Sequence, residues 1–194
     1  MILIMVIDKK LIQSLFDQAV VNPRLRINYD LRNTEDDMSQ RMLNAMMPGT
    51  SVPIHRHPFS SESIMIICGS VDEVFYDNNG TEIERIHLNP VSLSFGCQVP
   101  KGVWHSIEVY EPSIIFEAKE GRYGYDRSEY LHPEEAPEAY RNDKPSPGLK
   151  KMVEYLIGDE ISSGNTDKLT APAVAEYLGA TEKEVQQIMD ELGY

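Results

Sequence analysis

Three histidines and one glutamate are spaced so that their side chains could bind a single metal ion. His55 and His57 are separated by one residue, so on a β-strand both imidazoles point to the same face. Pro58 interrupts that strand, Glu62 opens the next apolar run, and His105 begins a later strand-like segment. Three neutral nitrogens and a carboxylate suit a divalent transition metal and leave coordination positions open for water or a ligand. We expect one such ion, with Zn, Fe, Mn and Ni as the candidates.

The elements that would position these residues are short strands. Between about residues 38 and 118, apolar and alternating segments are separated by turn signals such as Pro48-Gly49, Asn78-Asn79-Gly80 and Asn89-Pro90. Many short strands at regular spacing predict an all-β sandwich or barrel. The predicted strands cover residues 39–47, 52–57, 63–68, 71–76, 81–88, 91–95, 103–109 and 113–118.

The two ends of the chain have a different pattern. Residues 1–7 are uniformly apolar, which predicts a strand buried on both faces or paired with another subunit. Asp8 can cap a helix that Pro23 ends. Residues 130–147 collect prolines and charges without periodicity and predict a surface linker. Residues 148–194 then predict a small helical extension that includes a capping box at Thr181 and Glu184. The main domain is therefore expected at residues 1–129.

Composition restricts the partners. The formal net charge of −13 disfavours binding to nucleic acid or to anionic membranes. Residues 170–194 resemble a helix-turn-helix, but they hold one lysine and five acids, whereas a helix that reads DNA needs positive charge. Residues 1–7 are too short to span a bilayer and lack the features of a signal peptide. A cytoplasmic location, no membrane partner and a homodimer are the expectations.

The histidine-containing segments resemble the two motifs of the cupin superfamily. Gly49, His55-x-His57, Glu62 and Gly69 follow the spacing of the complete first motif, and Pro100-x-Gly102-x-x-His105 resembles the core of the second. The second segment departs from the family pattern at Ser94 and Val109. This resemblance implies a mainly β fold, a cupin-type jelly roll or double-stranded β-helix. It also implies that His55, His57, Glu62 and His105 are the metal ligands.

Residues 24–123 more narrowly resemble the WbuC-type cupins of bacterial gene clusters for surface polysaccharides. That resemblance implies a cytoplasmic metalloprotein of polysaccharide biosynthesis that takes a small molecule related to a sugar or sugar nucleotide. A metal of this kind could serve an isomerase or epimerase by polarising a carbonyl or hydroxyl group. The first alternative is a metal-dependent dioxygenase. The second is a non-catalytic sensing or regulatory cupin that signals through the C-terminal helices, so whether the protein is an enzyme stays open.

Nine further residues are candidates for substrate binding. A guanidinium group near the start of the cupin-like segment could hold a carboxylate or a phosphate. Glu117 and Lys119 share one face of a strand, either as a solvated charged face or as an acid/base pair inside the barrel. The complete set is Arg26, Asn28, Tyr29, Arg41, Gln98, Lys101, Glu117, Lys119 and Tyr123.

Overall fold

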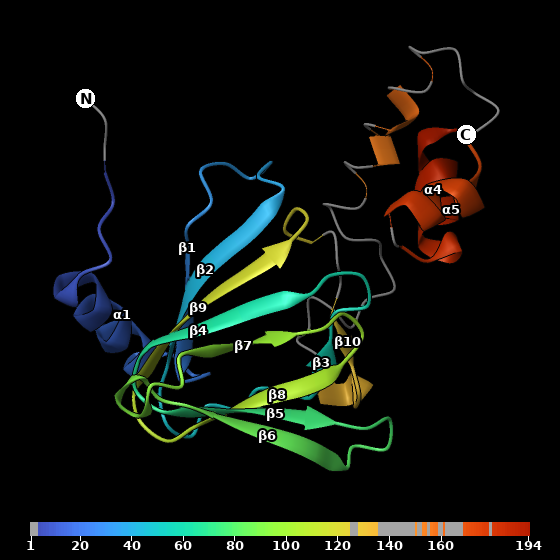
Figure 1. Ribbon diagram of the computed structural model, residues 1–194. Helices are drawn as coiled ribbons and strands as arrows, with labels where there is room; N and C mark the ends of the chain where they lie inside the picture. The colour runs from blue at the N-terminus through green and yellow to red at the C-terminus, as the bar shows by residue number, and fades with distance from the viewer. Residues whose placement is uncertain are drawn as a thin grey trace.

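In the part of the chain that the structure describes, ten strands form two five-stranded antiparallel sheets (Figure 1). The computed structural model describes residues 4–124, 128–135, 150, 153–154, 156–158, 161, 169–178 and 180–194. The first sheet has the order β1 (Arg26–Asp30), β2 (Ser39–Met46), β9 (Ser113–Glu120), β4 (Glu62–Cys68) and β7 (Gly96–Val99). The second has the order β10 (Glu129–Tyr130), β3 (His55–Arg56), β8 (Trp104–Val109), β5 (Val71–Tyr76) and β6 (Glu82–Leu88).

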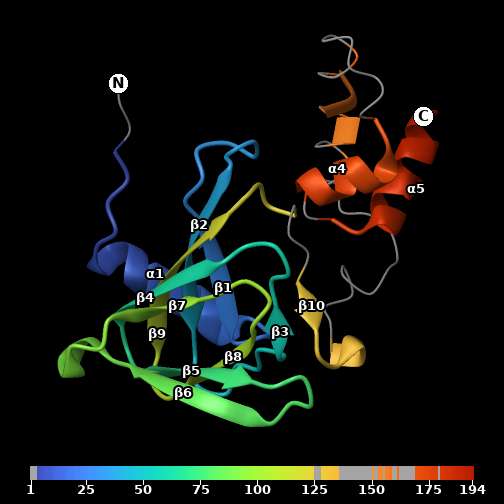
Figure 2. The same cartoon turned by 45° about the vertical axis from the view of Figure 1, so that its right-hand side comes forward.

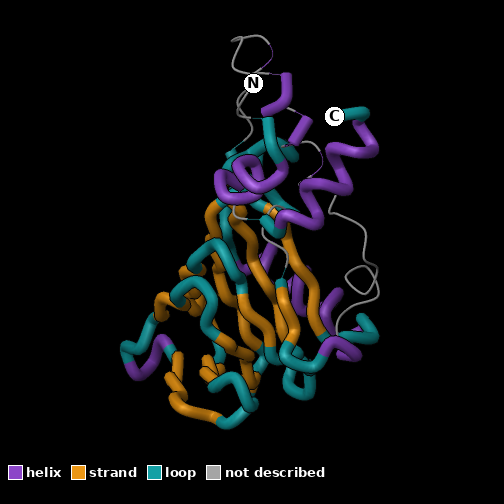
Figure 3. The backbone as a smooth tube through the Cα atoms, turned by 90° about the vertical axis from the view of Figure 1, so that its right-hand side faces the viewer, coloured by secondary structure: helices purple, strands orange, loops and turns teal. Residues whose placement is uncertain are grey.

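The connections between the sheets make this fold a jelly roll. Apart from the β5–β6 hairpin, successive strands from β2 to β9 alternate between the two sheets, in the orders β2-β9-β4-β7 and β3-β8-β5-β6. Eight strands wound in this way form the two Greek keys of a jelly roll. The strands make up the body of the molecule and the helices lie outside it (Figure 3). The predicted mainly β jelly roll is therefore confirmed.

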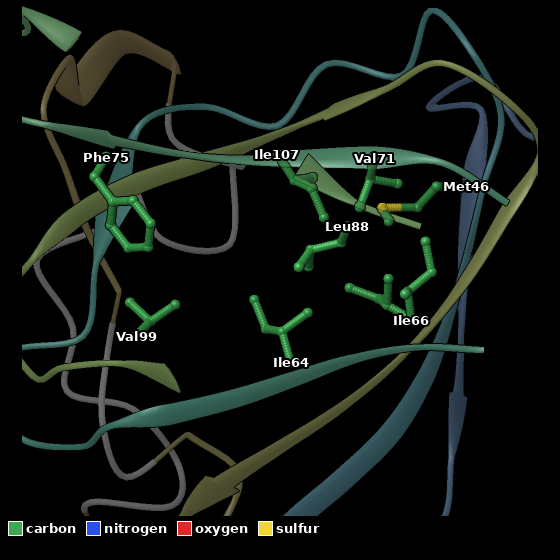
Figure 4. Packing of buried hydrophobic residues seen from close by; sticks show 9 residues of the cluster. Met46, Ile64, Ile66, Val71, Phe75, Leu88, Val99 and Ile107 are labelled. Atoms are coloured by element: carbon green, nitrogen blue, oxygen red, sulfur yellow. The ribbon is translucent and has the colours of Figure 1, made fainter. Parts of the chain in front are cut away.

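A hydrophobic core fills the space between the sheets. Strand residues alternate between inward and outward positions, and the inward ones are apolar over most of their length. Side chains from both sheets point toward one another in Figure 4. The buried members are Met46, Ile64, Ile66, Val71, Phe75, Leu88, Val99, Ile107 and Ile115.

Helix α1 (Lys9–Val21) covers the outer face of the first sheet, where a second cluster lies. The side chain of Asp8 accepts a hydrogen bond from the Leu11 amide at 2.9 Å, which confirms the predicted N-cap. Leu15 and Ala19 are buried against Leu43, Ala45 and Ile114 of β2 and β9. Both faces of β2 and β9 are therefore covered, one by α1 and the other by the core.

Three sequence predictions need correction. Residues 4–7 form no strand, and Ile4 is 79% exposed, because these residues pair with no strand that the structure describes. Residues 91–95 are not the expected strand, since η1 (Pro90–Ser92) is a 3-10 turn that Asn89 caps before β7 begins at Gly96. Pro90 favours this turn because its fixed φ suits a helical start. Three observed strands, β1, β7 and β10, have no counterpart among the predicted strands.

The C-terminal helices have a core of their own. Helix α4 (Ala171–Leu178) and helix α5 (Glu182–Leu192) enclose a cluster of buried side chains, and Thr181 and Glu184 form the predicted capping box. The cluster comprises Val153, Ile157, Ala171, Val174, Ala175, Val185, Ile188 and Met189. The predicted linker at 130–147 falls mostly outside the described residues, so the proposed division into 1–129, 130–147 and 148–194 stays a prediction. In the described part of the chain, no helix has the length and apolar character needed to cross a membrane.

Gly69 should be intolerant of any side chain. Its φ is +93°, and an added Cβ would lie 2.5 Å from the Pro112 carbonyl oxygen and 2.2 Å from Ser113 Oγ. Gly102 has a similar φ of +75°, but an added Cβ there would meet nothing within 4 Å. We expect Gly102→Ala to lower the free energy of unfolding by about 1 kcal/mol through backbone strain alone. Gly69→Ala should lower it by about 2 kcal/mol more, because the steric clash adds to the strain. Urea unfolding of both variants tests this, and equal losses would contradict the steric argument.

Candidate metal centre

Strands β3 and β8 bring the three histidines together. His55 and His105 are directly opposite in the β3–β8 pair, and their ring centroids are 4.3 Å apart. His57 follows the end of β3, and its ring centroid lies 5.2 Å from that of His55 and 5.7 Å from that of His105. One ring nitrogen of each histidine lies within 4.8 Å of the other two. The three imidazoles therefore form a compact cluster that could hold one metal ion.

Backbone carbonyls orient two of the imidazoles. His55 Nδ1 lies 2.9 Å from the Pro53 carbonyl oxygen, and His105 Nδ1 lies 2.9 Å from that of Val103. A carbonyl oxygen only accepts hydrogen bonds, so each Nδ1 carries the proton and each Nε2 keeps its lone pair. Among the described residues, His105 Nε2 is buried and has no hydrogen-bond partner. Such second-sphere bonds are typical of histidines that ligate a metal through Nε2.

Glu62 approaches the histidine cluster from the opposite sheet. It is the first residue of β4, and its Oε2 atom lies 3.0 Å from His57 Nε2 and 3.9 Å from His105 Nε2. Among the described residues, this buried oxygen has no hydrogen-bond partner, although His57 Nε2 lies only 3.0 Å away. A buried carboxylate oxygen and a buried imidazole nitrogen without partners are the donors that a divalent cation would satisfy. The donor set therefore fits the expected metal.

The protonation states suit metal binding. Burial, reinforced by the neighbouring His105 and His57, lowers the pKa of His55 well below its ordinary value of 6.5. Burial likewise lowers the pKa of His105. Burial alone would raise the pKa of Glu62, but the close approach of His57 and the positive charge of Lys119 bring it to about 2. At neutral pH His55 and His105 are therefore neutral imidazoles and Glu62 is a carboxylate, which are the forms that bind metals.

Lys119 lies beside the cluster. Its Nζ atom is 3.3 Å from both ring nitrogens of His57, and the residue is only 9% exposed. Strand pairing places Lys119 opposite Glu62 across β9 and β4. The hydroxyl of Ser128 lies 3.4 Å from His57 Nδ1. A fixed ammonium group next to a candidate ligand opposes a metal cation at the same centre.

A cavity of about 210 Å³ opens onto the histidine cluster and Glu62. Its lining residues come from both sheets and include His55 of β3 and Tyr130 of β10, two strands that pair and lie side by side in Figure 2. Among the residues predicted to bind substrate, its lining includes Arg26, Asn28, Glu117, Lys119 and Tyr123. Lining residues that the sequence did not single out include Gln40, Asn44, Glu73, Ser106, Ser128 and Tyr130.

Four residues predicted to bind substrate do not line this cavity. Tyr29 and Arg41 alternate with lining residues of β1 and β2, so they face the other side of the sheet. Tyr29 packs near α1, and Arg41 forms an ion pair with Asp37 at 2.6 Å. Gln98 accepts a hydrogen bond from Ser63 at an exposed position, and Lys101 lies exposed in a turn. These four residues therefore lie outside the lining of the cavity.

Glu117 is a half-buried acid that lines the cavity. The side-chain amide of Asn44 donates a hydrogen bond to Glu117 Oε2 at 2.8 Å. Burial and the negative charge of Glu62 raise the pKa of Glu117 to about 7, despite the opposing effects of Lys119 and Asn44. The sequence left open whether Glu117 and Lys119 form a solvated charged face or an acid/base pair inside the barrel. The structure places both side chains at the cavity inside the barrel.

The raised pKa of Glu117 predicts a pH dependence of stability. Because the folded pKa of about 7 exceeds the ordinary value of 4.5, the folded state holds its proton where the unfolded state has released it. The stabilisation is complete below about pH 4.5 and is lost as the pH rises through 7. The free energy of unfolding of metal-free protein should therefore fall between pH 5 and 8. We expect Glu117→Gln to reduce this fall by about 1–3 kcal/mol. Urea unfolding at several pH values measures this, and parallel curves for the two proteins would contradict it.

The chain has partial similarities to known proteins. A family model described as a domain of unknown function (DUF6016) matches residues 7–88, less than half of the chain. No curated protein matches the sequence. The capsular polysaccharide assembling protein CapF from Staphylococcus aureus is 18% identical with a TM-score of 0.47, over 58% of this chain and 31% of that chain.

Two other solved structures have a similar likeness. A mutant of Bacillus subtilis oxalate decarboxylase OxdC is 18% identical with a TM-score of 0.44, over 59% of this chain and 30% of that chain. KdgF from Halomonas sp. is 17% identical with a TM-score of 0.41, over 53% of this chain and 83% of that chain. The match thus spans about a third of the CapF and oxalate decarboxylase chains. The chemistry of the site rests on its own geometry.

Proposed function

We propose that this protein is a metal-binding cupin of the WbuC type that takes a sugar-like or sugar-nucleotide-like small molecule. In this proposal His55, His57, Glu62 and His105 hold one divalent transition metal. The observation that supports it is the convergence of three imidazoles and a carboxylate from both sheets on one cavity. A cytoplasmic location, a homodimer and a role in surface-polysaccharide biosynthesis belong to the same proposal, since they follow from the sequence resemblance.

The cavity supplies groups for proton transfer next to a polarised oxygen. A bound divalent metal acts as a Lewis acid toward a carbonyl or hydroxyl oxygen. Glu117 has a pKa of about 7, so it can both accept and release a proton at neutral pH. Asn44 holds its carboxyl in place, and Lys119 lies on the same strand face two residues away. This arrangement favours an isomerase or epimerase that moves a proton beside a carbonyl group.

A sensing cupin is the second candidate. The helices α4 and α5 enclose their own buried cluster and carry an acidic surface, which suits contact with a basic protein partner. In that case the cavity binds its ligand without turnover, and the helices transmit the bound state.

Incubation of the metal-loaded protein with a nucleoside-diphosphate keto sugar tests these functions. Proton NMR follows the sugar under argon and under air, while an oxygen electrode records uptake, and His57→Ala protein is the control. Conversion under argon that is absent from the variant supports the isomerase. Conversion that requires oxygen identifies the dioxygenase instead. Binding without conversion favours the sensor. A folded wild-type protein that takes up none of Zn²⁺, Mn²⁺, Fe²⁺ or Ni²⁺ would refute the metal site itself.

A further inference from the structure

Glu73 is a buried acid that the fold does not explain. It lies in β5 between Val71 and Phe75, both of which belong to the hydrophobic core. Its exposure is only 1%, and neither carboxyl oxygen has a hydrogen-bond partner among the described residues. Leaving a buried polar group without a partner is destabilising, and an apolar residue would suit this position better. A residue that breaks the local pattern in this way often serves a functional site.

The surroundings of Glu73 favour its protonated form. Burial raises its pKa well above the ordinary value of 4.5, and the negative charges of Glu62 and Glu117 reinforce the effect. A protonated carboxyl offers one O–H donor and a carbonyl acceptor. It can therefore exchange a pair of hydrogen bonds with a hydroxyl group, which is itself both a donor and an acceptor.

The cavity restricts what could bring such a hydroxyl group. Glu73 lines the same space as the histidine cluster, together with uncharged polar side chains such as Gln40, Asn44 and Ser106. The volume of about 210 Å³ is below the roughly 300–1,000 Å³ of pockets for drug-sized ligands. A monosaccharide ring fits this scale, whereas a complete sugar nucleotide would have to leave its nucleotide outside. The charged side chains of the lining have both signs, Glu62 and Glu117 against Arg26 and Lys119, so the lining as a whole does not select an anionic ligand.

We propose that Glu73 is a ligand-binding residue that hydrogen-bonds a hydroxyl group of a neutral, monosaccharide-sized molecule held at the histidine cluster. This inference rests on the proposed function and refines it, because it names the recognising residue and the chemical class of the group that enters the cavity. The unpartnered carboxyl is a specificity element whose presence destabilises the ligand-free fold.

Two variants of Glu73 distinguish a role in binding the ligand from a role in stabilising the fold. Glu73→Gln keeps a donor and an acceptor in nearly the same shape, and Glu73→Leu keeps the approximate volume without polarity. Glu84→Gln, at an exposed position on β6, is the matched control for loss of an acid. Zn²⁺-loaded proteins are titrated with D-ribose, D-xylose, D-glucose and D-galactose, with D-gluconate as the anionic comparison, by isothermal calorimetry. Zinc content and the melting temperature are measured for every protein.

We expect wild-type protein to bind at least one neutral sugar more tightly than D-gluconate. Glu73→Gln should bind that sugar within about threefold of wild type, and Glu73→Leu should bind about tenfold more weakly, since a lost hydrogen bond has about that effect. Zinc content should not change. Glu73→Leu should also melt at a higher temperature than wild type, because the unpartnered carboxyl is gone.

Several outcomes would overturn the inference while leaving the metal site intact. These are undiminished sugar binding by zinc-loaded Glu73→Leu, a preference for D-gluconate, or no binding of any sugar by zinc-loaded wild type. A Glu73→Leu protein that melts lower or fails to fold, together with a destabilised Glu73→Gln, would assign Glu73 a structural role. Failure of the wild-type protein to retain zinc would instead count against the proposed function.

Discussion

Replacement of His105 by alanine is expected to lower metal affinity by about a hundredfold or more, because the site then loses one of its ligands. The imidazole is 2% exposed, its Nδ1 bonds the Val103 carbonyl, and its Nε2 has no partner among the described residues. No other described side chain pairs with His55 across β3 and β8 in this way. Elemental analysis of protein purified without chelator should find about one metal per chain in wild type and almost none in the variant.

His87→Ala is the matched control for this experiment. His87 is an exposed histidine of β6, and its Nδ1 lies 2.6 Å from Asp72 Oδ1 on the outer face of the second sheet. Its loss should leave metal content unchanged. Circular dichroism checks that both variants keep the β fold. Equal metal content in wild type and in folded His105→Ala protein would exclude His105 as a ligand.

Replacement of Lys119 by methionine is expected to tighten metal binding. The Lys119 ammonium lies 3.3 Å from both ring nitrogens of His57, so it opposes a cation at the same centre. Two like charges about 4 Å apart repel by about 4 kcal/mol at an effective dielectric constant of about 20. Relaxation of the site and partial screening reduce this effect. We therefore expect the affinity for Zn²⁺ to rise by roughly ten- to a hundredfold.

Competition with a chromogenic chelator measures this affinity in wild-type and Lys119→Met protein. Lys101→Met serves as the control, because it removes the same charge from an exposed turn outside the cavity. Its effect on affinity should be within about twofold of wild type, since solvent screens exposed charges. Weaker binding by Lys119→Met would show that Lys119 orients His57 for the metal rather than repelling it.

The core of the site was predictable because metal ligation depends on residue type and short-range spacing. His55 and His57 on one strand face, followed by Glu62 at the start of the next strand, are local features of the sequence. The structure places these residues with His105 at one centre, although the metal itself stays a proposal. Strand alternation also predicted that Glu117 and Lys119 share one face of a strand, without indicating whether that face is exposed to solvent or lies inside the barrel.

Other parts of the site were not predictable in the same way. Glu73 carried one signal, an acid at an inward position between Val71 and Phe75. Only the structure shows that neither of its oxygens has a hydrogen-bond partner among the described residues. The segment of Arg26, Asn28 and Tyr29 was not predicted to be a strand, so the sequence analysis did not assign these side chains to opposite faces. In the structure, alternation along β1 and β2 directs Arg26 and Asn28 to the cavity and Tyr29 and Arg41 to the other face.

The sequence by itself determined the alternation of short strands, the caps at Asp8 and Thr181, and the spacing of the candidate ligands. These depend on interactions between residues close together in the chain, so local chemistry is enough to predict them. Only the tertiary structure decided which sheet each strand joins and that Lys119 lies against His57. These outcomes depend on pairing between distant segments, and local sequence does not encode the register of such pairs.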